Sequence, residues 1–206
     1  MAKIFTDAAR IRASRVIEPL ARGLLRVGVS PDAVTVAGTL GVVAAAVGFG
    51  ARGQFVVAAL LVAGFALVDT LDGTMARLRG HSTRFGAVLD STMDRIGDGA
   101  VFGAIAFWYA TTGERPTLVA ALICLVAAQV ISYVKARAQS VGIPCDVGLV
   151  ERAERLLVVG VGGLATGLGV GWALPVALWV LAVLSLVTVV QRILHVRRGD
   201  RREGDR

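Results

Sequence analysis

The sequence has little cysteine and offers no disulfide framework. It contains 2 cysteines among 206 residues. Cys124 lies in the middle of an apolar run, and Cys145 lies in a predicted loop beyond the end of that run. Two thiols in these places cannot stabilise a small secreted fold, so the disulfide-rich class of proteins is excluded.

Charge is also missing from most of the chain. Five stretches contain no Asp, Glu, Lys or Arg: residues 33–51, 53–68, 99–113, 116–134 and 156–191. With 55% hydrophobic residues and 25 glycines, this profile excludes an ordinary soluble domain and is typical of a polytopic membrane protein. A span needs about 20 residues, so the last stretch must turn back once. We therefore predict an all-α fold with six transmembrane helices.

The basic residues predict the topology of these spans. If the spans alternate, Arg52 and Arg115 lie on one side and the other 20 of the 22 Lys and Arg residues lie on the opposite side. The positive-inside rule then places both termini in the cytoplasm and makes the chain a multi-pass protein of the cell membrane. This topology accounts for the net charge of +7, and we expect no nucleic-acid partner.

The N-terminal segment, residues 1–30, is predicted to lie on the cytoplasmic membrane surface. Val16, Leu20, Leu24 and Val27 recur at helical spacing with arginines on the other face. This pattern is typical of an amphipathic helix on anionic lipid, and a solvated basic tail is the alternative. Residues 196–206 form a second basic tail. We expect residues 1–206 to form one membrane domain.

One charged segment, residues 68–98, interrupts the apolar pattern. It contains five aspartates and four arginines but no proline or asparagine, which argues against an aspartate-rich soluble loop. Counted at the helical rise from Gly53, Asp72 lies about 29 Å along the second span, and counted back from Gly113, Asp94 lies about 29 Å along the third. The hydrocarbon core is about 30 Å thick, so both sets of aspartates reach its cytoplasmic boundary.

Each of these two helices carries its aspartates on a single face beside small residues. The first face contains Asp69, Asp72, Gly73 and Ala76, and the second contains Gly86, Asp90 and Asp94. Four carboxylates in one volume would repel each other unless cations lie between them. Oxygen ligands, with no histidine or cysteine on either face, favour two Mg²⁺ ions, with Mn²⁺ as the other candidate. Structural ion pairs with Arg77, Arg84 and Arg95 are the alternative, although charges inside a membrane are by default functional.

These residues complete a signature that resembles the CDP-alcohol phosphotransferase family. The pattern D-x-x-D-G-x-x-A-R over 69–77 is followed, after eight residues, by G-x-x-x-D-x-x-x-D over 86–94, and all eight fixed letters are present. The resemblance implies an enzyme in which a hydroxyl attacks the β-phosphorus of a CDP-linked lipid and CMP leaves. It also implies metal ligands at Asp69, Asp72, Asp90 and Asp94, with Asp94 acting in addition as the general base.

The resemblance further implies contacts to CDP-diacylglycerol, the lipid substrate. Residues 30–35, SPDAVT, resemble the Pro-Asn-x-x-Thr stretch of the family, although Asp32 replaces the asparagine. The implied contacts are Pro31, Asp32, Thr35, Gly73, Ala76, Arg77, Thr83 and Gly86. The family resemblance also implies a homodimer in membrane lipid.

Four basic residues at two cytoplasmic helix ends predict a phosphorylated acceptor. Lys135 and Arg137 end the fourth span, and Arg152 and Arg155 open the fifth. Such cations suit a phosphate, although they are also typical membrane anchors. Residues 132–140 and 82–95 are similar to actinobacterial phosphatidylinositol phosphate synthases, which implies inositol 1-phosphate as acceptor. Glycerol 3-phosphate, used by phosphatidylglycerophosphate synthases, is the alternative.

Two other functional classes fit the sequence poorly. An ion-coupled transporter usually has repeated interrupted spans, whereas the acidic segment occurs once. A prenyltransferase would need adjacent aspartates, which are absent here.

Two further features of the sequence concern helix packing. Gly163 and Gly167 form a close-packing pattern that could serve a helix pair within one chain or a dimer. Asp98 is expected to be a buried polar group in helix packing.

Overall fold

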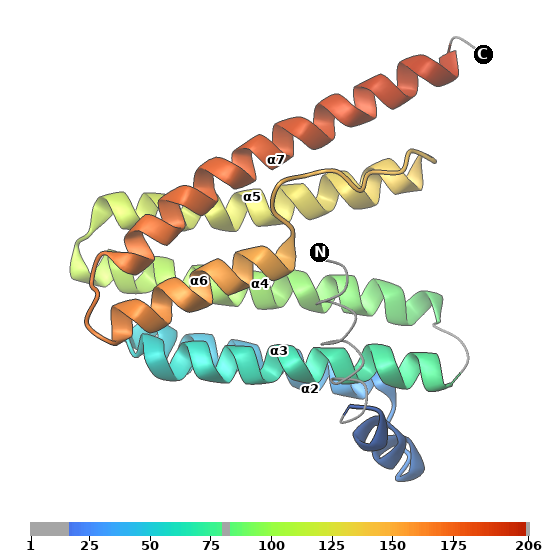
Figure 1. Ribbon diagram of the computed structural model, residues 1–206, viewed down its shortest axis with the longest axis horizontal. Coiled ribbons are helices and arrows are strands. Elements are labelled where there is room, and N and C mark those ends of the chain that lie inside the picture. The colour runs from blue at the N-terminus through green and yellow to red at the C-terminus, as the bar shows by residue number, and fades with distance from the viewer. Residues whose placement is uncertain (1–16, 80–82, 205–206) are drawn as a thin grey trace, which may run out of the picture. The chain divides into compact units, whose positions relative to one another are not determined.

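Every regular element in the described part of the chain is a helix (Figure 1). The computed structural model describes residues 17–79 and 83–204, except for the side chains of Asp69 and of residues 200–204. Within this part of the chain, residues 17–26 are helical. The labelled elements are α2 (Pro31–Gly48), η1 (Gly50–Arg52), α3 (Phe55–Leu78), α4 (Arg84–Thr112), α5 (Arg115–Ser140), α6 (Arg152–Gly167) and α7 (Ala173–Gly204). The predicted all-α class is confirmed.

Four helical stretches of the described chain are long and apolar enough to cross a membrane. They are Pro31–Arg52, Phe55–Leu78, Arg115–Ser140 and Ala173–Gly199. α4 and α6 are not among them, because α4 carries aspartates and arginines in its first half and α6 has only 16 residues. The chain is a membrane protein, while the count of six spans stays a prediction.

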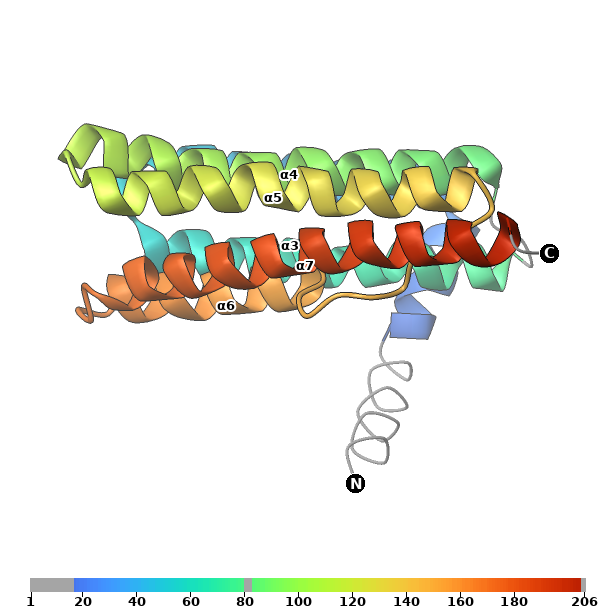
Figure 2. The same cartoon turned by 90° about the horizontal axis from the view of Figure 1, so that it is seen from above.

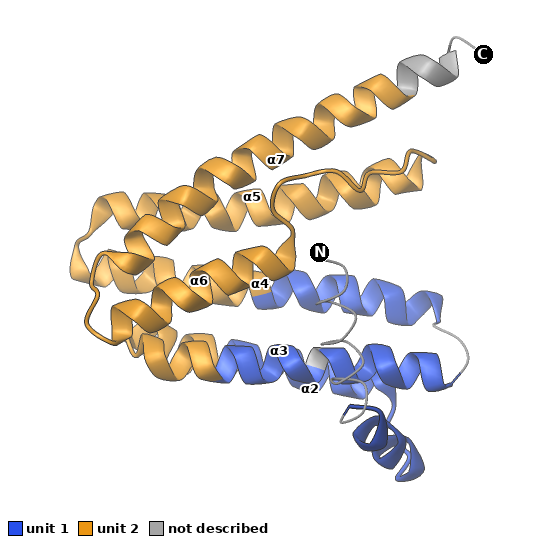
Figure 3. Ribbon diagram, in the orientation of Figure 1, with its two compact units in different colours: residues 1–43, 61–97 blue, residues 44–60, 98–206 orange. Residues whose placement is uncertain are grey.

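The chain forms two compact units, each assembled from two separate stretches (Figure 3). Unit 1 comprises the described residues up to Val43 together with Leu61–Gly97, and unit 2 comprises Ala44–Leu60 together with the described residues from Asp98 onward. Both α3 and α4 therefore contribute one part to each unit. One membrane domain over residues 1–206 stays a prediction.

The core of unit 1 joins the N-terminal helix to α2 and α3. Ala21, Val34 and Met75 form its buried centre, and Leu24 packs against it. Leu20 on the same N-terminal helix is exposed. An apolar side chain left on the outer face fits the amphipathic segment predicted from the sequence. The remainder of that segment, residues 1–16, lies outside the described residues.

In unit 2, α7 packs against both α5 and α6 (Figures 1 and 2). Small residues permit close approach between helices. A Cβ atom added to Gly162 would lie 2.8 Å from the Cβ of Ala177, and one added to Gly167 would lie 2.6 Å from Cγ2 of Val56. Gly167 therefore packs against a residue of its own chain. Of the two alternatives left by the sequence, a helix pair within one chain or a dimer, this contact is the first.

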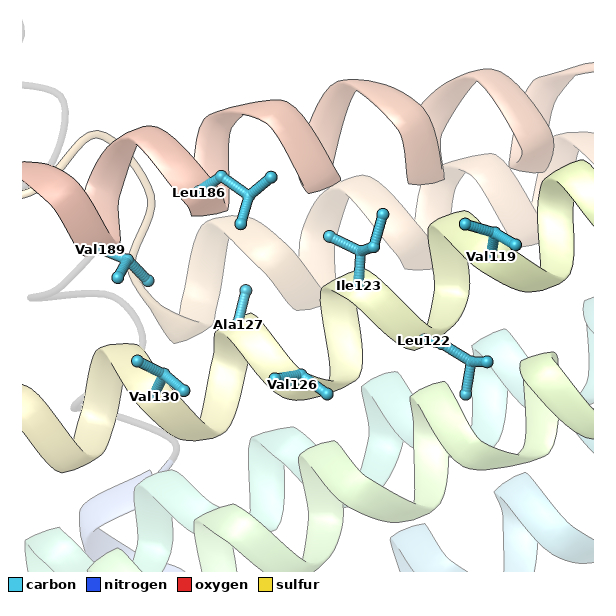
Figure 4. Close-up of a pocket in the computed structure, with 8 residues that line it drawn as sticks. All are labelled: Val119, Leu122, Ile123, Val126, Ala127, Val130, Leu186 and Val189. Carbon is cyan, nitrogen blue, oxygen red and sulfur yellow. The ribbon is translucent and has the colours of Figure 1, made fainter.

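An apolar groove runs between α5 and α7 (Figure 4). Its lining is entirely aliphatic: Val119, Leu122, Ile123, Val126, Ala127, Val130, Leu186 and Val189. Since both helices are candidate spans, this surface suits lipid hydrocarbon. Its lining residues offer no polar group to a phosphate, so the polar chemistry of the protein must lie elsewhere.

Candidate active site

The predicted metal carboxylates belong to unit 1 and lie on two consecutive helices. α3 and α4 are joined by residues 79–83 and run antiparallel (Figures 1 and 2). Asp72 is in the second half of α3, whereas Asp90 and Asp94 are in the first half of α4. Asp69 is one turn before Asp72, but its side chain lies outside the described residues.

Asp72 is held in place by neighbouring hydrogen-bond donors. Its side chain is 8% exposed. The hydroxyl of Thr35, on α2, donates to Oδ2, and the backbone N–H of Gly73 donates to Oδ1. Thr35 is itself buried. Two residues separated by 37 positions are thereby joined, and the bond fixes the orientation of this carboxylate. From the sequence, Thr35 was predicted to contact the nucleotide, and its contact with Asp72 was not predicted.

The two aspartates of α4 are more accessible than Asp72. Asp90 is exposed and Asp94 is half-buried. Nη2 of Arg95 lies 3.6 Å from Oδ2 of Asp94, a long ion pair between chain neighbours. Among the described side chains, which do not include Asp69, no three Asp, Glu, His or Cys residues are grouped closely enough to hold a metal ion.

The donor chemistry of these residues nevertheless suits a hard divalent cation. Asp72, Asp90 and Asp94 offer oxygen atoms only, which is the preference of Mg²⁺ and Mn²⁺. Asp72 also combines burial with an orientation fixed by Thr35, as expected of a metal ligand supported by a neighbouring hydrogen bond. The residues present therefore fit the implied ions in chemistry.

The predicted nucleotide contacts gather at the starts of α2 and α4. The hydroxyl of Thr83 accepts a hydrogen bond of 2.9 Å from the N–H of Gly86, which caps α4. A Cβ atom on Gly86 would lie 3.3 Å from Oδ1 of Asp32. The structure thus brings Asp32, Thr83 and Gly86 together within unit 1. Pro31, the first residue of α2, directly precedes Asp32.

Gly73 leaves open space on the surface of α3. An added Cβ atom would meet only Nη1 of Arg77, at 3.9 Å. Gly73 and Arg77 are both exposed, and Ala76 between them is half-buried. Small residues beside an exposed guanidinium allow an anionic ligand to approach the helix backbone closely.

The predicted acceptor cations lie in unit 2 and differ widely in exposure. Arg155 is buried with 1% exposure, and its Nη2 donates to Oδ2 of Asp98 at 2.8 Å. Nε of Arg152 lies 3.4 Å from Oδ1 of the same carboxylate. Arg137 is exposed and donates to the hydroxyl of Ser140. Asp98, also 1% exposed, is buried as predicted, and its arginine partners are new.

Lys135 is paired with a carboxylate of the loop that follows α5. Its Nζ lies 2.7 Å from Oδ1 of Asp146. This hydrogen bond and the charge of Lys135 lower the pKa of Asp146 below its usual value. Because Asp146 is largely exposed, the pair leaves Lys135 within reach of a solvent-borne anion.

Two buried polar residues of α7, Thr188 and Arg192, were not predicted from the sequence. Arg192 is 3% exposed. It donates from Nε to the carbonyl of Val147 at 2.8 Å and from Nη1 to the carbonyl of Ile131 at 2.7 Å. A usable signal was present, since Arg192 is the first charge after a 36-residue apolar run and stands one helical turn after Thr188.

The comparisons with known proteins agree on one family. The sequence model of the CDP-alcohol phosphatidyltransferase family matches residues 28–195. The phosphatidylinositol phosphate synthase of Streptomyces avermitilis is 48% identical over 198 residues, which cover 92% of this chain and 81% of that protein. That of Mycobacterium tuberculosis is 50% identical over 194 residues, covering 90% of this chain and 87% of the relative.

Solved structures of the M. tuberculosis enzyme are similar over most of the chain. The crystal structure with CDP-diacylglycerol bound has a TM-score of 0.86 at 49% identity and covers 88% of this chain and 94% of that chain. The structure in complex with manganese and citrate has a TM-score of 0.85 at 49% identity and covers 87% and 88%, respectively.

Proposed function

The chain belongs to the CDP-alcohol phosphatidyltransferase family, and we propose that it transfers the phosphatidyl group of CDP-diacylglycerol to inositol 1-phosphate, with release of CMP. The observation that carries the proposal is the complete aspartate signature on consecutive helices α3 and α4. Phosphatidylinositol phosphate synthases that are about half identical over nine-tenths of the chain support it.

The metal ligands would be Asp69, Asp72, Asp90 and Asp94, and two ions are proposed. When bound, Mg²⁺ or Mn²⁺ would neutralise the diphosphate and stabilise the charge that develops on the departing CMP. The oxygen-only donor set and the hydrogen bond from Thr35 to Asp72 support this assignment. A relative that crystallised with manganese is consistent with it.

Asp94 is the proposed general base. The acceptor hydroxyl oxygen forms a new bond to the β-phosphorus, the bond from that phosphorus to the CMP oxygen breaks, and Asp94 takes the hydroxyl proton. An alcohol is a weak nucleophile until its proton is removed, so a carboxylate within reach accelerates the attack. Partial exposure of Asp94 leaves it open to an incoming hydroxyl.

The nucleotide half of CDP-diacylglycerol is proposed to lie over the exposed part of α3 and the starts of α2 and α4. The contacts would come from Pro31, Asp32, Thr35, Gly73, Ala76, Arg77, Thr83 and Gly86. Open space at Gly73 and the proximity of Asp32 to Gly86 support this assignment. Arg77 would pair with the diphosphate, since guanidinium forms strong charge-assisted hydrogen bonds to phosphate.

The acceptor phosphate is proposed to bind Lys135, Arg137, Arg152 and Arg155. Nε of Arg155 is buried and has no hydrogen-bond partner among the described residues. A donor in that state is satisfied when an anion binds beside it, because an unpaired buried donor costs about 1–3 kcal/mol. Asp98 accepts a hydrogen bond from Nη2 of the same guanidinium and thereby fixes its plane.

The proposed membrane topology rests on the distribution of the basic residues. We propose a multi-pass protein of the cell membrane with its termini and active site in the cytoplasm, since 20 of the 22 Lys and Arg residues would then lie inside. A homodimer is proposed from the family resemblance alone.

The deciding experiment measures CMP release by the purified protein from CDP-diacylglycerol with three acceptors in parallel. Inositol 1-phosphate should be the best substrate, and free inositol should be poor because it leaves the cations unpaired. A better rate with glycerol 3-phosphate would overturn the inositol assignment and leave the family chemistry intact. Equal rates with inositol and its phosphate would overturn the proposed cation pocket.

A further inference from the structure

The loop between α5 and α6, residues 141–151, lies along one face of α7. From Thr188 onward, residues at helical spacing contact it in turn. The contacting residues of α7 are Thr188, Arg192, His195, Val196 and Gly199. Spacings of three and four put them on one stripe of the helix. The stretch of α7 from Thr188 to Gly199 therefore supports this loop.

Thr188 makes the most demanding of these contacts. Its side chain is 0% exposed. The hydroxyl donates to the carbonyl of Leu184 at 2.8 Å and accepts from the backbone N–H groups of Leu149 at 3.2 Å and Val150 at 3.3 Å. One donor and two acceptor sites are the full capacity of a hydroxyl. The group is therefore saturated, and two loop amides depend on it.

Gly148 shows that the loop conformation is fitted to Thr188. Its φ is +143°, and a Cβ atom added there would lie 2.6 Å from Cγ2 of Thr188. Only glycine adopts this backbone conformation readily and also allows so close an approach. Gly148 directly precedes the two hydrogen-bonded amides, and the position of Thr188 therefore restricts this site to glycine.

The segment held by Thr188 leads directly into α6. Val150 is followed by Glu151 and then by Arg152, the first residue of the helix. Arg155 is in the same turn and reaches Asp98. Arg192, one turn after Thr188, ties the carbonyl of Val147 to that of Ile131 on α5. The placement of both arginines at the start of α6 consequently depends on where α7 holds the loop.

We propose that Thr188 is a positioning residue for the acceptor: through the amides of Leu149 and Val150 it holds the start of α6 so that Arg152 and Arg155 can bind the acceptor phosphate. This inference rests on the proposed function. Without the hydroxyl, two buried N–H groups lose their acceptor and the loop populates other conformations. The apparent affinity for the acceptor then falls in proportion to the fraction of molecules that remain competent.

The test compares Thr188→Val, which keeps the shape and removes the hydroxyl, with Thr188→Ser, which keeps the hydroxyl. Thr188→Val should raise the KM for inositol 1-phosphate roughly three- to tenfold, with kcat and the KM for CDP-diacylglycerol unchanged. Thr188→Ser should behave like the native protein. Ser185→Ala is the matched control, because Ser185 is also buried on α7 and its Oγ has no hydrogen-bond partner among the described residues.

Two further measurements test the inference, and the first keeps it testable if Thr188→Val folds poorly. Gly148→Ala places a methyl group against Thr188 and should displace the loop from α7. It should raise the KM for the acceptor and leave kcat and the KM for CDP-diacylglycerol unchanged. Amide hydrogen exchange on the native protein and on Thr188→Ser should show protected amides at Leu149 and Val150 in both. In a folded Thr188→Val protein these two amides should exchange faster than their neighbours on α5 and α7.

Each outcome separates this inference from the proposed function. If Arg155→Gln raises the acceptor KM and Thr188→Val and Gly148→Ala do not, the positioning role of Thr188 is wrong and the acceptor site stands. If the Thr188 variant lowers kcat and weakens donor and acceptor alike, the residue is merely structural and the inference also fails. If Arg155→Gln leaves the acceptor KM unchanged, the proposed acceptor site falls together with this inference.

Discussion

Unit 1 presents carboxylates along two helices, whereas unit 2 presents cations around a loop. In unit 1, Asp72 is oriented by one hydroxyl and by an N–H of its own helix, and Asp90 stands exposed. In unit 2, Lys135 and Arg155 are each paired with a carboxylate of the chain. Helix register places the carboxylates of unit 1, and one distant contact, from Thr35, orients Asp72. The pairs of unit 2 depend on contacts between separate elements.

The difference shows which role each region can take. Carboxylates that repel each other gain from an added divalent cation, so unit 1 suits metal binding. Cations that already have carboxylate partners keep their net charge low until an anion arrives, so unit 2 suits reversible binding of a phosphate. A variant that removes a charge from unit 1 should therefore change different kinetic parameters from a variant that removes a charge from unit 2.

The largest effect is expected from Asp72→Asn and Asp90→Asn. Each removes a proposed metal ligand together with its charge, and CMP release should fall by roughly 10²-fold or more. A chelator should abolish the activity of the native protein, and added Mg²⁺ or Mn²⁺ should restore it. Glu114→Gln is a suitable control, since Glu114 precedes α5 at the opposite end of α4. Full activity in chelator would contradict the metal assignment.

Asp94→Asn should separate catalysis from binding within unit 1. If Asp94 is the general base, kcat should fall by roughly 10²–10⁴. Binding of CDP-diacylglycerol, measured by titration of the lipid, should persist. An Asp94→Asn protein with normal kcat and a raised KM for the lipid would assign the residue to binding instead.

Arg155→Gln should affect the proposed acceptor site in unit 2. Loss of a charge-assisted hydrogen bond should raise the KM for inositol 1-phosphate roughly ten- to a hundredfold, with little change for CDP-diacylglycerol. The substitution also leaves Asp98 buried without its closest partner, so the double variant with Asp98→Asn serves as the stability control. The exposed Arg197, changed to glutamine, should have no effect on either KM.

Thr35→Val is expected to have the smallest effect of the four. It removes the hydroxyl that orients Asp72, and loss of such a supporting contact lowers metal affinity by about tenfold or somewhat more. The Mg²⁺ concentration that gives half-maximal activity should rise, and Thr35→Ser should restore the native value. An unchanged Mg²⁺ requirement would show that this hydrogen bond has no part in metal binding.

The sequence allowed the carboxylates to be predicted as one set because their spacing is local. Asp69 and Asp72, like Asp90 and Asp94, are related by single helical turns, and a helix fixes such residues on one face. Their exact separation in space depends on how α3 packs on α4, which spacing does not encode. The contact between Thr35 and Asp72 was invisible for the same reason.

The cations illustrate the limit of local patterns more clearly. Lys135 and Arg155 could be selected as basic residues at helix ends, but Asp98 is 57 residues from Arg155 and Thr188 is 39 residues from Leu149. Partners at such separations are brought together by tertiary packing alone. Helix α6 was predicted as a span from its apolar run, and its 16 residues leave that prediction open.

The discontinuous units affect the order in which parts of the chain can fold during synthesis. Residues up to 97 supply all of unit 1, so its carboxylate hairpin has every partner once the first half of α4 has emerged from the ribosome. Residues 44–60, made earlier than that hairpin, belong to unit 2 and must wait for everything after residue 97. If unit 1 forms as it is made, residues 44–60 reach their partners in unit 2 only after α5, α6 and α7 have been synthesised.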